Sequence, residues 1–420
     1  MAPIDDSLSS RISSDCPQDT RDLLHHAWAH NLSGLKKLVT ARDKATAQDP
    51  RTLETPLHAA IRACGPADGH DDGCVDETKP VLEELFLSGA IWNDVDDHGE
   101  TPGCVARRLG RHSLYRMCVD AGVRAELLFA LMMGGYEELA SGSEADHDPQ
   151  VDNQSEEADI GHEPPVCEAI DDKARGTVDA GEKAVTSDEY LHSVLTLDDD
   201  KLLDSDLNGV MMAWETDIMR RSVAALIPDS HKGMRVLNIG FGMGIIDRIF
   251  ADLKPSRHHI IEAHPSVVAR ASKNESGFGP DWEKSGPEPN AFKVHAGKWQ
   301  EVVPKLLEQG EIYDAIYFDT FAEDYAQLRT FFTEYVPGLL DQHGRFSFFN
   351  GLGADRQICY DVYTKVVDMH CADAGLDVEW SESRVDMTGL DEDGKGQWKG
   401  VRRRYWTLDS YRLPICTFMG

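Results

Sequence analysis

The sequence predicts an α/β protein in which a parallel, doubly wound sheet forms the C-terminal half and a small helical domain precedes it. Three observations lead to this prediction. Short apolar runs alternate with helical stretches after residue 190, a glycine-rich turn follows the first of these runs, and an acidic segment divides the chain. The length of 420 residues suits two or three domains, and a hydrophobic content of 41% is enough for a sizeable core.

The acidic segment holds a large share of the charge. The chain carries 42 basic and 74 acidic residues, a formal net charge of −32 at pH 7. Residues 141–189 contain 15 acidic residues, three basic residues and no aromatic residue, and so contribute −12. With so little to bury, this stretch cannot offset the entropy of ordering, and we expect a flexible acidic linker over residues 141–186. We also expect residues 1–19 to be disordered.

The composition also narrows the partners and the location. An acidic surface disfavours nucleic acid and favours basic proteins or cationic molecules. The nine cysteines show neither CxxC pairs nor zinc-ligand spacing, which predicts reduced thiols, no metal site, and a cytoplasmic and nuclear location. No secretory signal is evident, and no stretch of about 18 apolar residues predicts a membrane span. We therefore expect a monomer with neither nucleic acid nor a membrane as its partner.

Residues 20–135 are predicted to form short helices in pairs. Apolar helical patterns occur at Ala59–Ala63, Val81–Leu87 and Leu114–Leu128. Thr55-Pro56 and Thr101-Pro102 each mark a helix start, because threonine caps the free amides and proline at the first helical position gives up no hydrogen bond.

The first of these helix starts resembles a known repeat. Thr55-Pro56-Leu57-His58-Ala59-Ala60 is similar to the ankyrin signature T-P-L-H-x-A, and Val81–Val95 resembles a second ankyrin helix with its following turn. The spacing from Thr55 to Thr101 is 46 residues instead of about 33, and an insertion over residues 65–78 would account for the excess. The alternative is a generic array of helix pairs. An ankyrin-like unit would bind a partner or pack on the second domain.

Residues 187–420 alternate between strand and helix patterns. The predicted strands are Met234–Ile239, His258–Glu262, Ala291–His295, Tyr313–Asp319 and Gly344–Phe349, with late antiparallel strands at Arg403–Leu408 and Pro414–Phe418. The predicted helices are Gly244–Leu253, Ser266–Ala271, Trp299–Leu307 and Tyr325–Leu340. Residues 275–290, between the second and third strands, are rich in glycine and proline and are interpreted as a surface loop.

The strongest single feature is the turn Gly240-Phe241-Gly242-Met243-Gly244, which follows the first strand and opens a helix. Glycines at this place allow a tight turn and a close approach of the backbone to a nucleotide. Glu262 ends the second strand 22 residues after Gly240, where a carboxylate can accept hydrogen bonds from both hydroxyls of a ribose. A nicotinamide site remains an alternative on these features alone, although the turn lacks the pyrophosphate spacing GxGxxG.

Further motifs follow in order at the predicted edge of the sheet. They are Met211-Met212-Ala213-Trp214-Glu215-Thr216-Asp217-Ile218-Met219, Gly297-Lys298-Trp299 and Tyr317-Phe318-Asp319-Thr320-Phe321. Together with Val236–Met243, they resemble guanidinoacetate N-methyltransferase and, more closely, the fungal type IV protein arginine N-methyltransferases, which carry an ankyrin-like N-terminal region. The resemblance implies a seven-stranded, Rossmann-like class I methyltransferase domain over residues 187–420.

The resemblance also implies S-adenosylmethionine as the cofactor. Asn238–Met243 would wrap it, Glu262–His264 would hold the ribose and the adenine edge, and Lys298 and Trp299 would flank the adenine. The implied cofactor-binding positions are Tyr190, Met211, Met219, Asn238, Ile239, Gly240, Phe241, Gly242, Met243, Glu262, Ala263, His264, Lys298, Trp299 and Asp319. Asn238 stands where guanidinoacetate N-methyltransferase has an acid. Trp299 could instead be a core residue, since large aromatic side chains usually are.

Asp319 and Glu215 are the expected catalytic residues. Asp319 follows a strand at its carboxyl end, where open α/β sheets place their ligands. Two carboxylates can grip the fork of a guanidinium by charge-assisted bonds, and Asp319 is the better candidate to receive its proton. The alternatives are a surface acid for Glu215 and a helix cap for Asp319.

The resemblance further implies the reaction. Guanidinoacetate N-methyltransferase acts on the guanidine nitrogen that already bears carbon, and the matching atom of a protein arginine is the delta nitrogen. No paired-glutamate loop of the type I and II arginine methyltransferases follows the cofactor motifs. We expect monomethylation at the delta nitrogen of an arginine in a basic protein, with a ribosomal protein as the implied substrate. The alternatives are a small-molecule guanidine methyltransferase and an inactive binding scaffold.

Overall fold

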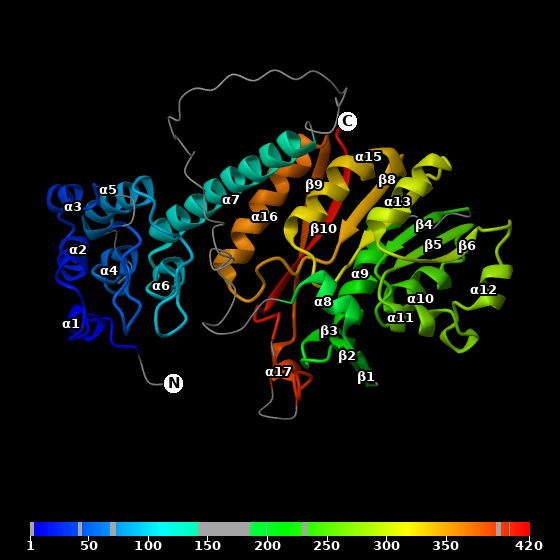
Figure 1. The fold of residues 1–420 in the computed structure, drawn as a ribbon, viewed down its shortest axis with the longest axis horizontal. Helices are drawn as coiled ribbons and strands as arrows, with labels where there is room; N and C mark the ends of the chain where they lie inside the picture. The colour runs from blue at the N-terminus through cyan, green and yellow to red at the C-terminus, as the bar shows by residue number, and fades with distance from the viewer. Residues whose placement is uncertain are drawn as a thin grey trace, which may run out of the picture. The chain divides into compact units, whose positions relative to one another are not determined.

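The computed structural model describes residues 4–40, 44–67, 73–141, 185–198, 200–228, 233–391, 396–402 and 404–420. They belong to two compact units, Met1–Lys183 and Ala184–Gly420 (Figure 1). Apart from its first and last residues, the predicted acidic linker lies outside the described residues.

The first unit is helical, as the sequence predicts. Its helices are α1 (Leu8–Arg11), α2 (Gln18–Trp28), α3 (Leu32–Leu38), α4 (Pro56–Arg62), α5 (Gly73–Leu87), α6 (Pro102–Arg108) and α7 (His112–Ser141). The Thr55 hydroxyl accepts a hydrogen bond from the His58 amide at the start of α4, and the Thr101 hydroxyl accepts one from the Cys104 amide at the start of α6. Both predicted helix starts are therefore confirmed, with their capping chemistry.

The prediction of disorder over residues 1–19 is wrong for the part that the structure describes. Helix α1 lies there, and its Arg11 side chain is only 2% exposed. The Arg11 guanidinium donates to Glu54 and to Asp96 at 3.0 Å each. The physical reason is that these two buried carboxylates need a cation, which a polar N-terminal segment can supply.

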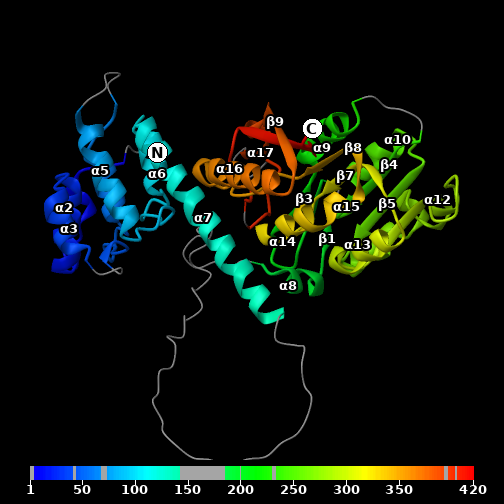
Figure 2. The same cartoon turned by 90° about the horizontal axis from the view of Figure 1, so that it is seen from above.

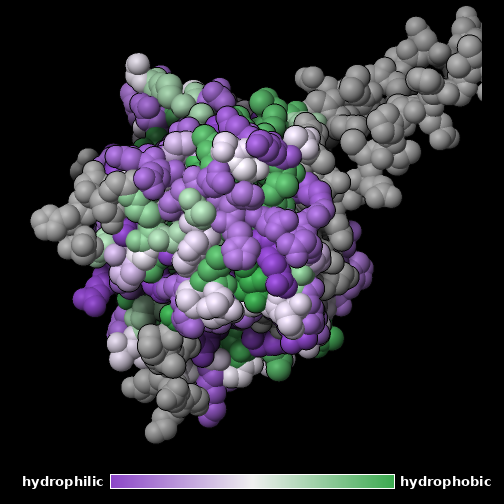
Figure 3. Space-filling view, turned by 90° about the vertical axis from the view of Figure 1, so that its left-hand side faces the viewer, coloured by the Kyte–Doolittle hydropathy of each residue, from purple (hydrophilic) through white to green (hydrophobic). Residues whose placement is uncertain are grey.

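The surface of this unit is largely polar on the side of α2 and α3. Figure 3 shows that face as mostly hydrophilic, with hydrophobic side chains in small, separate groups. Among the described residues, no helix is both long enough and apolar enough to cross a membrane.

The second unit is built on a seven-stranded sheet, as predicted. The strands lie in the order β6 (Phe292–Ala296), β5 (Arg257–Glu262), β4 (Arg235–Ile239), β7 (Tyr313–Phe318), β8 (Leu340–Phe348), β10 (Ser410–Phe418) and β9 (Leu376–Arg384). The first five are parallel, and β10 runs antiparallel to both of its neighbours. A second, three-stranded antiparallel sheet consists of β1 (Thr196–Leu197), β2 (Lys201–Leu203) and β3 (Gly209–Met212).

Helices cover both faces of the larger sheet (Figure 2). They are α8 (Ser187–His192), α9 (Thr216–Leu226), α10 (Ile245–Asp252), α11 (Pro265–Ala271), α12 (Pro280–Lys284), α13 (Trp299–Glu308), α14 (Tyr325–Thr330), α15 (Val336–Leu339), α16 (Gln357–Asp373) and α17 (Met387–Asp391). Two 3-10 turns, η3 (Ala213–Glu215) and η4 (Asn274–Ser276), and a π-helical segment, η5 (Phe331–Tyr335), accompany them. Side chains of β4 alternate between the two cores: Val236 packs with α9 and α10, and Leu237 packs with α13 and α16. The period of two fixes which face of the strand each residue covers.

Two local predictions are corrected by the structure. Within Arg403–Leu408, the described residues 404–408 form no strand, and β9 takes that place in the sheet. Residues 275–290 are not a passive loop, because Phe278 is buried and Trp282 stacks on Phe292 with ring centroids 5.1 Å apart. The segment covers the edge of the sheet at β6, which explains its aromatic content.

Candidate active site

A pocket lies at the carboxyl ends of β4, β5 and β7, where the order of the parallel strands reverses direction. Such switch points are where open α/β sheets bind their ligands. The pocket is lined by Ser187, Tyr190, Leu191, Val210, Met211, Ile239, Gly240, Gly242, Ile261, Glu262, Ala263, Gly297, Lys298, Trp299, Asp319, Thr320, Phe321 and Glu323. Ten of the residues predicted from the sequence are in this set: Tyr190, Met211, Ile239, Gly240, Gly242, Glu262, Ala263, Lys298, Trp299 and Asp319.

The glycine-rich turn sits tightly against the neighbouring strand. Gly240 has a φ of 95°, and a Cβ atom there would lie 1.8 Å from the backbone oxygen of Asp319. The Gly240 amide donates to the oxygen of Ile261 at 2.8 Å, and the Asp319 amide donates to the oxygen of Ile239 at 2.8 Å. Only glycine fits this place. The two hydrogen bonds join the ends of three strands at the floor of the pocket.

Glu262 organises the same turn from β5. Its Oε2 accepts from the amides of Phe241 at 2.9 Å and Gly242 at 3.2 Å, and its Oε1 accepts from the amide of His264 at 2.7 Å. Burial raises the pKa of Glu262, while these three amides act in the opposite direction. A carboxylate has about four lone-pair sites, and these amides take three of them, so one site on Oε1 remains for a ribose hydroxyl.

Aromatic and charged side chains form the rest of the wall. The Tyr190 ring lies 4.9 Å from the rings of both His264 and Phe321. The Trp299 indole nitrogen donates to both carboxylate oxygens of Glu323 at 3.1 and 3.0 Å. Trp299 is thus oriented by a specific partner, although it is also a core residue at 3% exposure. An oriented indole edge and a tyrosine ring on opposite elements suit a flat adenine.

Glu215 and Asp319 bring two buried carboxyl groups near one another. Glu215 lies on η3, is 3% exposed, and accepts hydrogen bonds from the Tyr405 hydroxyl and from the Met212 amide at 3.2 Å. Burial and the charge of Asp319 raise the pKa of Glu215 well above its ordinary value. Burial raises the pKa of Asp319 to about 7. The Asp319 Oδ2 atom is buried without a hydrogen-bond partner. A cation placed here would relieve the desolvation of both groups.

Six predicted site residues do not line the pocket. One is Glu215, described above, and the other five are cofactor positions that lie behind it. Met219 is fully buried in the core, and Phe241 packs edge-on against Phe278 at 5.4 Å. The amide of Met243 points at the sulfur of Met211, 3.1 Å away. His264 lies behind Tyr190.

Asn238, the fifth of these positions, ties the glycine-rich turn to helix α10. Its Nδ2 donates to the oxygen of Gly240 at 2.9 Å and to Asp247 at 2.8 Å. The buried acid nearest to this position is therefore Asp247, which also contacts His258 at 3.0 Å.

Comparison with known proteins identifies the family. The chain is 67% identical to protein arginine N-methyltransferase 2 of Gibberella zeae over 415 residues, covering 97% of this chain and 94% of the relative. It is 56% identical to the protein of that name from Neurospora crassa, covering 99% of each chain. The chain belongs to the protein arginine N-methyltransferase 2 family. A family model described as guanidinoacetate N-methyltransferase matches residues 194–372.

Two of the solved structures that are similar to part of this chain are a methyltransferase and a spermidine synthase. A magnesium protoporphyrin IX methyltransferase from Synechocystis with bound SAM is 13% identical, covers 49% of this chain and 80% of its own, and has a TM-score of 0.32. A spermidine synthase from Thermotoga maritima is 15% identical, covers 53% of this chain and 71% of its own, and has a TM-score of 0.34.

The pocket fits the cofactor of a methyltransferase. It combines a glycine cradle that a Cβ atom would fill, a carboxylate at the end of β5, and an orphaned buried oxygen of Asp319. The chemistry of these groups, the family assignment and the sequence prediction agree on S-adenosylmethionine. Glu262 would hold the ribose, and Tyr190 and Trp299 would enclose the adenine.

Besides several pocket-lining residues, the sequence analysis missed three side chains that hold the site in place. Tyr405 reaches Glu215 from a segment 190 residues later in the chain, and Glu323 orients Trp299. Arg270 of α11 donates to the oxygen of Gly242. None of them lies in a motif, although Glu323 comes only two residues after Phe321, the last residue of the Asp319 motif, and could have been included with it.

Replacing Glu262 should weaken cofactor binding before it affects the chemical step. In the unaltered protein, backbone amides donate to the Glu262 carboxylate, and hydrogen bonds to charged groups contribute about 1.5–3 kcal/mol each. In Glu262→Gln, the side-chain NH2 group replaces one of the accepting oxygens, so some of these hydrogen bonds are lost. We expect the affinity for S-adenosylmethionine, measured by calorimetry, to fall by about tenfold or more. The exposed Glu275→Gln serves as the matched control. An unchanged Kd in Glu262→Gln would remove Glu262 from the cofactor site.

Proposed function

We propose that this protein transfers a methyl group from S-adenosylmethionine to the delta nitrogen of an arginine in a basic, ribosomal protein, and that it stops at monomethylation. The observation that carries the proposal is the pair of carboxyl groups of Glu215 and Asp319, which are buried near one another beside the cofactor pocket. A guanidinium supplies the positive charge and the donors that this pair lacks.

The chain's own groups would prepare the guanidine for attack. An arginine side chain has a pKa of about 12.5 or higher, so a nitrogen lone pair becomes available only if a proton leaves. Asp319, with a pKa of about 7, is a stronger base than an ordinary carboxylate and can accept that proton as the new bond to carbon forms. Glu215 would hold the other edge of the guanidinium. The bound cofactor supplies an electrophilic methyl group on positively charged sulfur.

The delta position follows from the resemblance to guanidinoacetate N-methyltransferase and from the matching family model over residues 194–372. In guanidinoacetate the methylated nitrogen already bears carbon, and in arginine the corresponding nitrogen is the delta nitrogen. A site that holds the two terminal nitrogens between Glu215 and Asp319 leaves the inner nitrogen to face the methyl group.

The direct test is labelling in a cell extract. The purified protein, supplied with methyl-labelled S-adenosylmethionine, should label a ribosomal protein, and fragmentation in the mass spectrometer should place one methyl group on the delta nitrogen. Terminal or dimethylated arginine would overturn the proposed position. Label in free guanidinoacetate and in no protein would favour the small-molecule alternative. Cofactor binding without any label transfer would favour an inactive scaffold.

The helical unit has a separate proposed role. The Thr-Pro starts of α4 and α6 and their 46-residue spacing support an ankyrin-like pair with an insertion. Such a unit suits a macromolecular substrate, since a small guanidine needs no docking surface. We propose that it acts in a monomer found in cytoplasm and nucleus, as the free cysteines and acidic charge suggest.

Tyr405 is a positioning residue for Glu215. Its hydroxyl hydrogen bond lowers the pKa of Glu215, so Tyr405→Phe should raise that pKa further. Less of the ionised pair then exists at neutral pH, and the acidic limb of the kcat/KM profile should move to higher pH. Cofactor affinity should change little. The matched control is Tyr335→Phe, which also removes one hydroxyl but keeps the ring that meets Trp299 edge-on. If Tyr405→Phe lowers thermal stability but leaves the pH profile in place, the role of Tyr405 is structural.

A further inference from the structure

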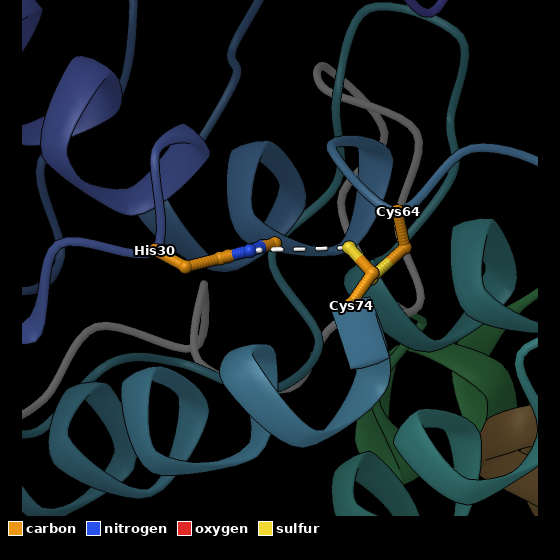
Figure 4. Close-up of side chains that lie close together, drawn as sticks. All are labelled: His30, Cys64 and Cys74. Carbon is orange, nitrogen blue, oxygen red and sulfur yellow. Dashed lines mark hydrogen bonds between the residues drawn. The ribbon is translucent and has the colours of Figure 1, made fainter. Parts of the chain in front are cut away.

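Three side chains that can bind a metal meet in the helical unit, although they come from separate parts of the sequence. His30 follows α2, Cys64 follows α4, and Cys74 lies in the first turn of α5 (Figure 4). The Cys64 and Cys74 sulfurs lie 2.9 Å apart, and the Nδ1 atom of His30 lies 3.9 Å from the Cys74 sulfur. The candidate ligand atoms all lie within 4.8 Å of one another. Figure 4 shows the imidazole ring directed at the two sulfurs.

The hydrogen bonds of His30 prepare it for this role. Its Nε2 lies 2.9 Å from the backbone oxygen of Ala60, and because a carbonyl can only accept, Nε2 carries the proton. The Thr78 hydroxyl donates to the oxygen of Cys74 at 2.6 Å, so its own oxygen can also accept from Nε2, 2.9 Å away. The unprotonated Nδ1 therefore faces the sulfurs. A histidine that donates one ring nitrogen to a backbone carbonyl and presents the other is the usual arrangement at a metal centre.

We propose that His30, Cys64 and Cys74 bind one zinc ion. Two thiolates and one neutral imidazole form a donor set typical of zinc. Around a tetrahedral ion with Zn–S of about 2.3 Å and Zn–N of about 2.0 Å, ligand atoms lie roughly 3.5–3.8 Å apart. The separation of His30 and Cys74 is already close to this. The sulfurs must move apart by less than about 1 Å, which rotation of the partly exposed Cys74 permits. Water completes the coordination.

A reversible disulfide is the competing use of the same two sulfurs. A disulfide would join only the two sulfurs and leave the Nδ1 lone pair of His30, which faces them, without a partner. An ion would use all three groups, whose ligand atoms already lie within 4.8 Å of one another. The arrangement of the three side chains therefore favours a metal over a disulfide.

The sequence hides this site because its ligands come from three separate helix ends. Nine residues lie between Cys64 and Cys74, and His30 comes 34 residues before Cys64, so the spacing is not that of a zinc finger. The bound ion would connect the ends of α2 and α4 with the start of α5.

The test uses the full chain, reduced and stripped of metal, and titrated with Zn²⁺ or with Co²⁺ as a spectroscopic probe. We expect one ion per chain, a thiolate-to-cobalt charge-transfer band, and a higher Tm with zinc. Cys64→Ser/Cys74→Ser should lose the band. His30→Gln should weaken affinity by at least the about 10- to 100-fold loss seen for outer-shell partners. Cys104→Ser, a cysteine of the same unit outside the cluster, is the control and should bind normally.

A second measurement guards against variants that fail to fold. In the unaltered protein, zinc should protect Cys74 from alkylation, as peptide mapping would show. Unprotected Cys74 at saturating zinc, binding unchanged in the double variant, or no ion bound at all would overturn the proposal. So would a Cys64–Cys74 disulfide that forms readily in air at the expense of zinc binding.

Discussion

Asp319→Asn is expected to lower turnover by about a hundredfold or more, the loss typical of a positioned base, while cofactor affinity stays within a few-fold of the unaltered protein. Asparagine keeps the shape of the side chain but can neither carry the charge nor accept the proton of a guanidinium. Asp319 lines the pocket, and its Oδ2 atom has no other partner there. Single-turnover methylation and calorimetry with the cofactor separate the two quantities.

Although Asp319→Asn should lower turnover, it should raise the stability of the folded protein at alkaline pH. Burial raises the pKa of Asp319 from 3.8 to about 7, so the folded protein holds a proton that the unfolded chain releases over this range. The unaltered protein should therefore lose stability as pH rises from about 4 to about 7, and Asp319→Asn should be the more stable of the two at pH 8. The activity of the unaltered protein should also rise through about pH 7 as Asp319 ionises in the free enzyme.

Asp377→Asn provides the matched control for Asp319, since Asp377 is an exposed aspartate on β9 of the same sheet. It should leave turnover and the pH dependence of stability unchanged. Full activity in Asp319→Asn would exclude the residue from proton transfer. Equal loss of cofactor affinity and turnover would instead make Asp319 a cofactor ligand alone.

The elements that sequence reasoning found are those whose signals are local. Thr55-Pro56 marks a helix start through its own capping chemistry. Strand β4 and helix α10 are recognised from the spacing of their apolar residues. Strand β9 was missed although Leu376, Val378 and Trp380 alternate with polar residues; this signal is short, and the second half of this edge strand is polar throughout. Helix α1 was missed because the two carboxylates that bury Arg11 come from elsewhere in the chain.

The site divides in the same way. Gly240 and Asp319 follow their strands directly and Glu262 ends its strand, so a linear motif is enough to place all three around one pocket. Tyr405 depends on a chain segment without regular structure that returns 190 residues later, and no periodic pattern predicts such a return. Motifs therefore identify the cofactor site better than the groups that adjust its acidity.

Gly240→Ala should weaken cofactor binding to a degree that left-handed backbone strain alone cannot explain. The new Cβ atom would lie 1.8 Å from the backbone oxygen of Asp319. Neither partner is a flexible side chain, so the turn and the end of β7 must move apart by about 1 Å or more, and a misplacement of that size can cost about 100-fold in rate. We expect cofactor affinity and turnover to fall together by about this factor or more.

Gly233→Ala separates the two causes. Gly233 has a φ of 96°, almost the 95° of Gly240, but a Cβ atom there meets nothing within 4 Å. Both variants pay the same cost of about 1–2 kcal/mol for an alanine in the left-handed region, which unfolding experiments would detect. Only Gly240→Ala adds the collision with Asp319. If the two variants bind the cofactor equally well, the close contact between Gly240 and Asp319 does not shape the pocket, and the turn merely needs a flexible residue.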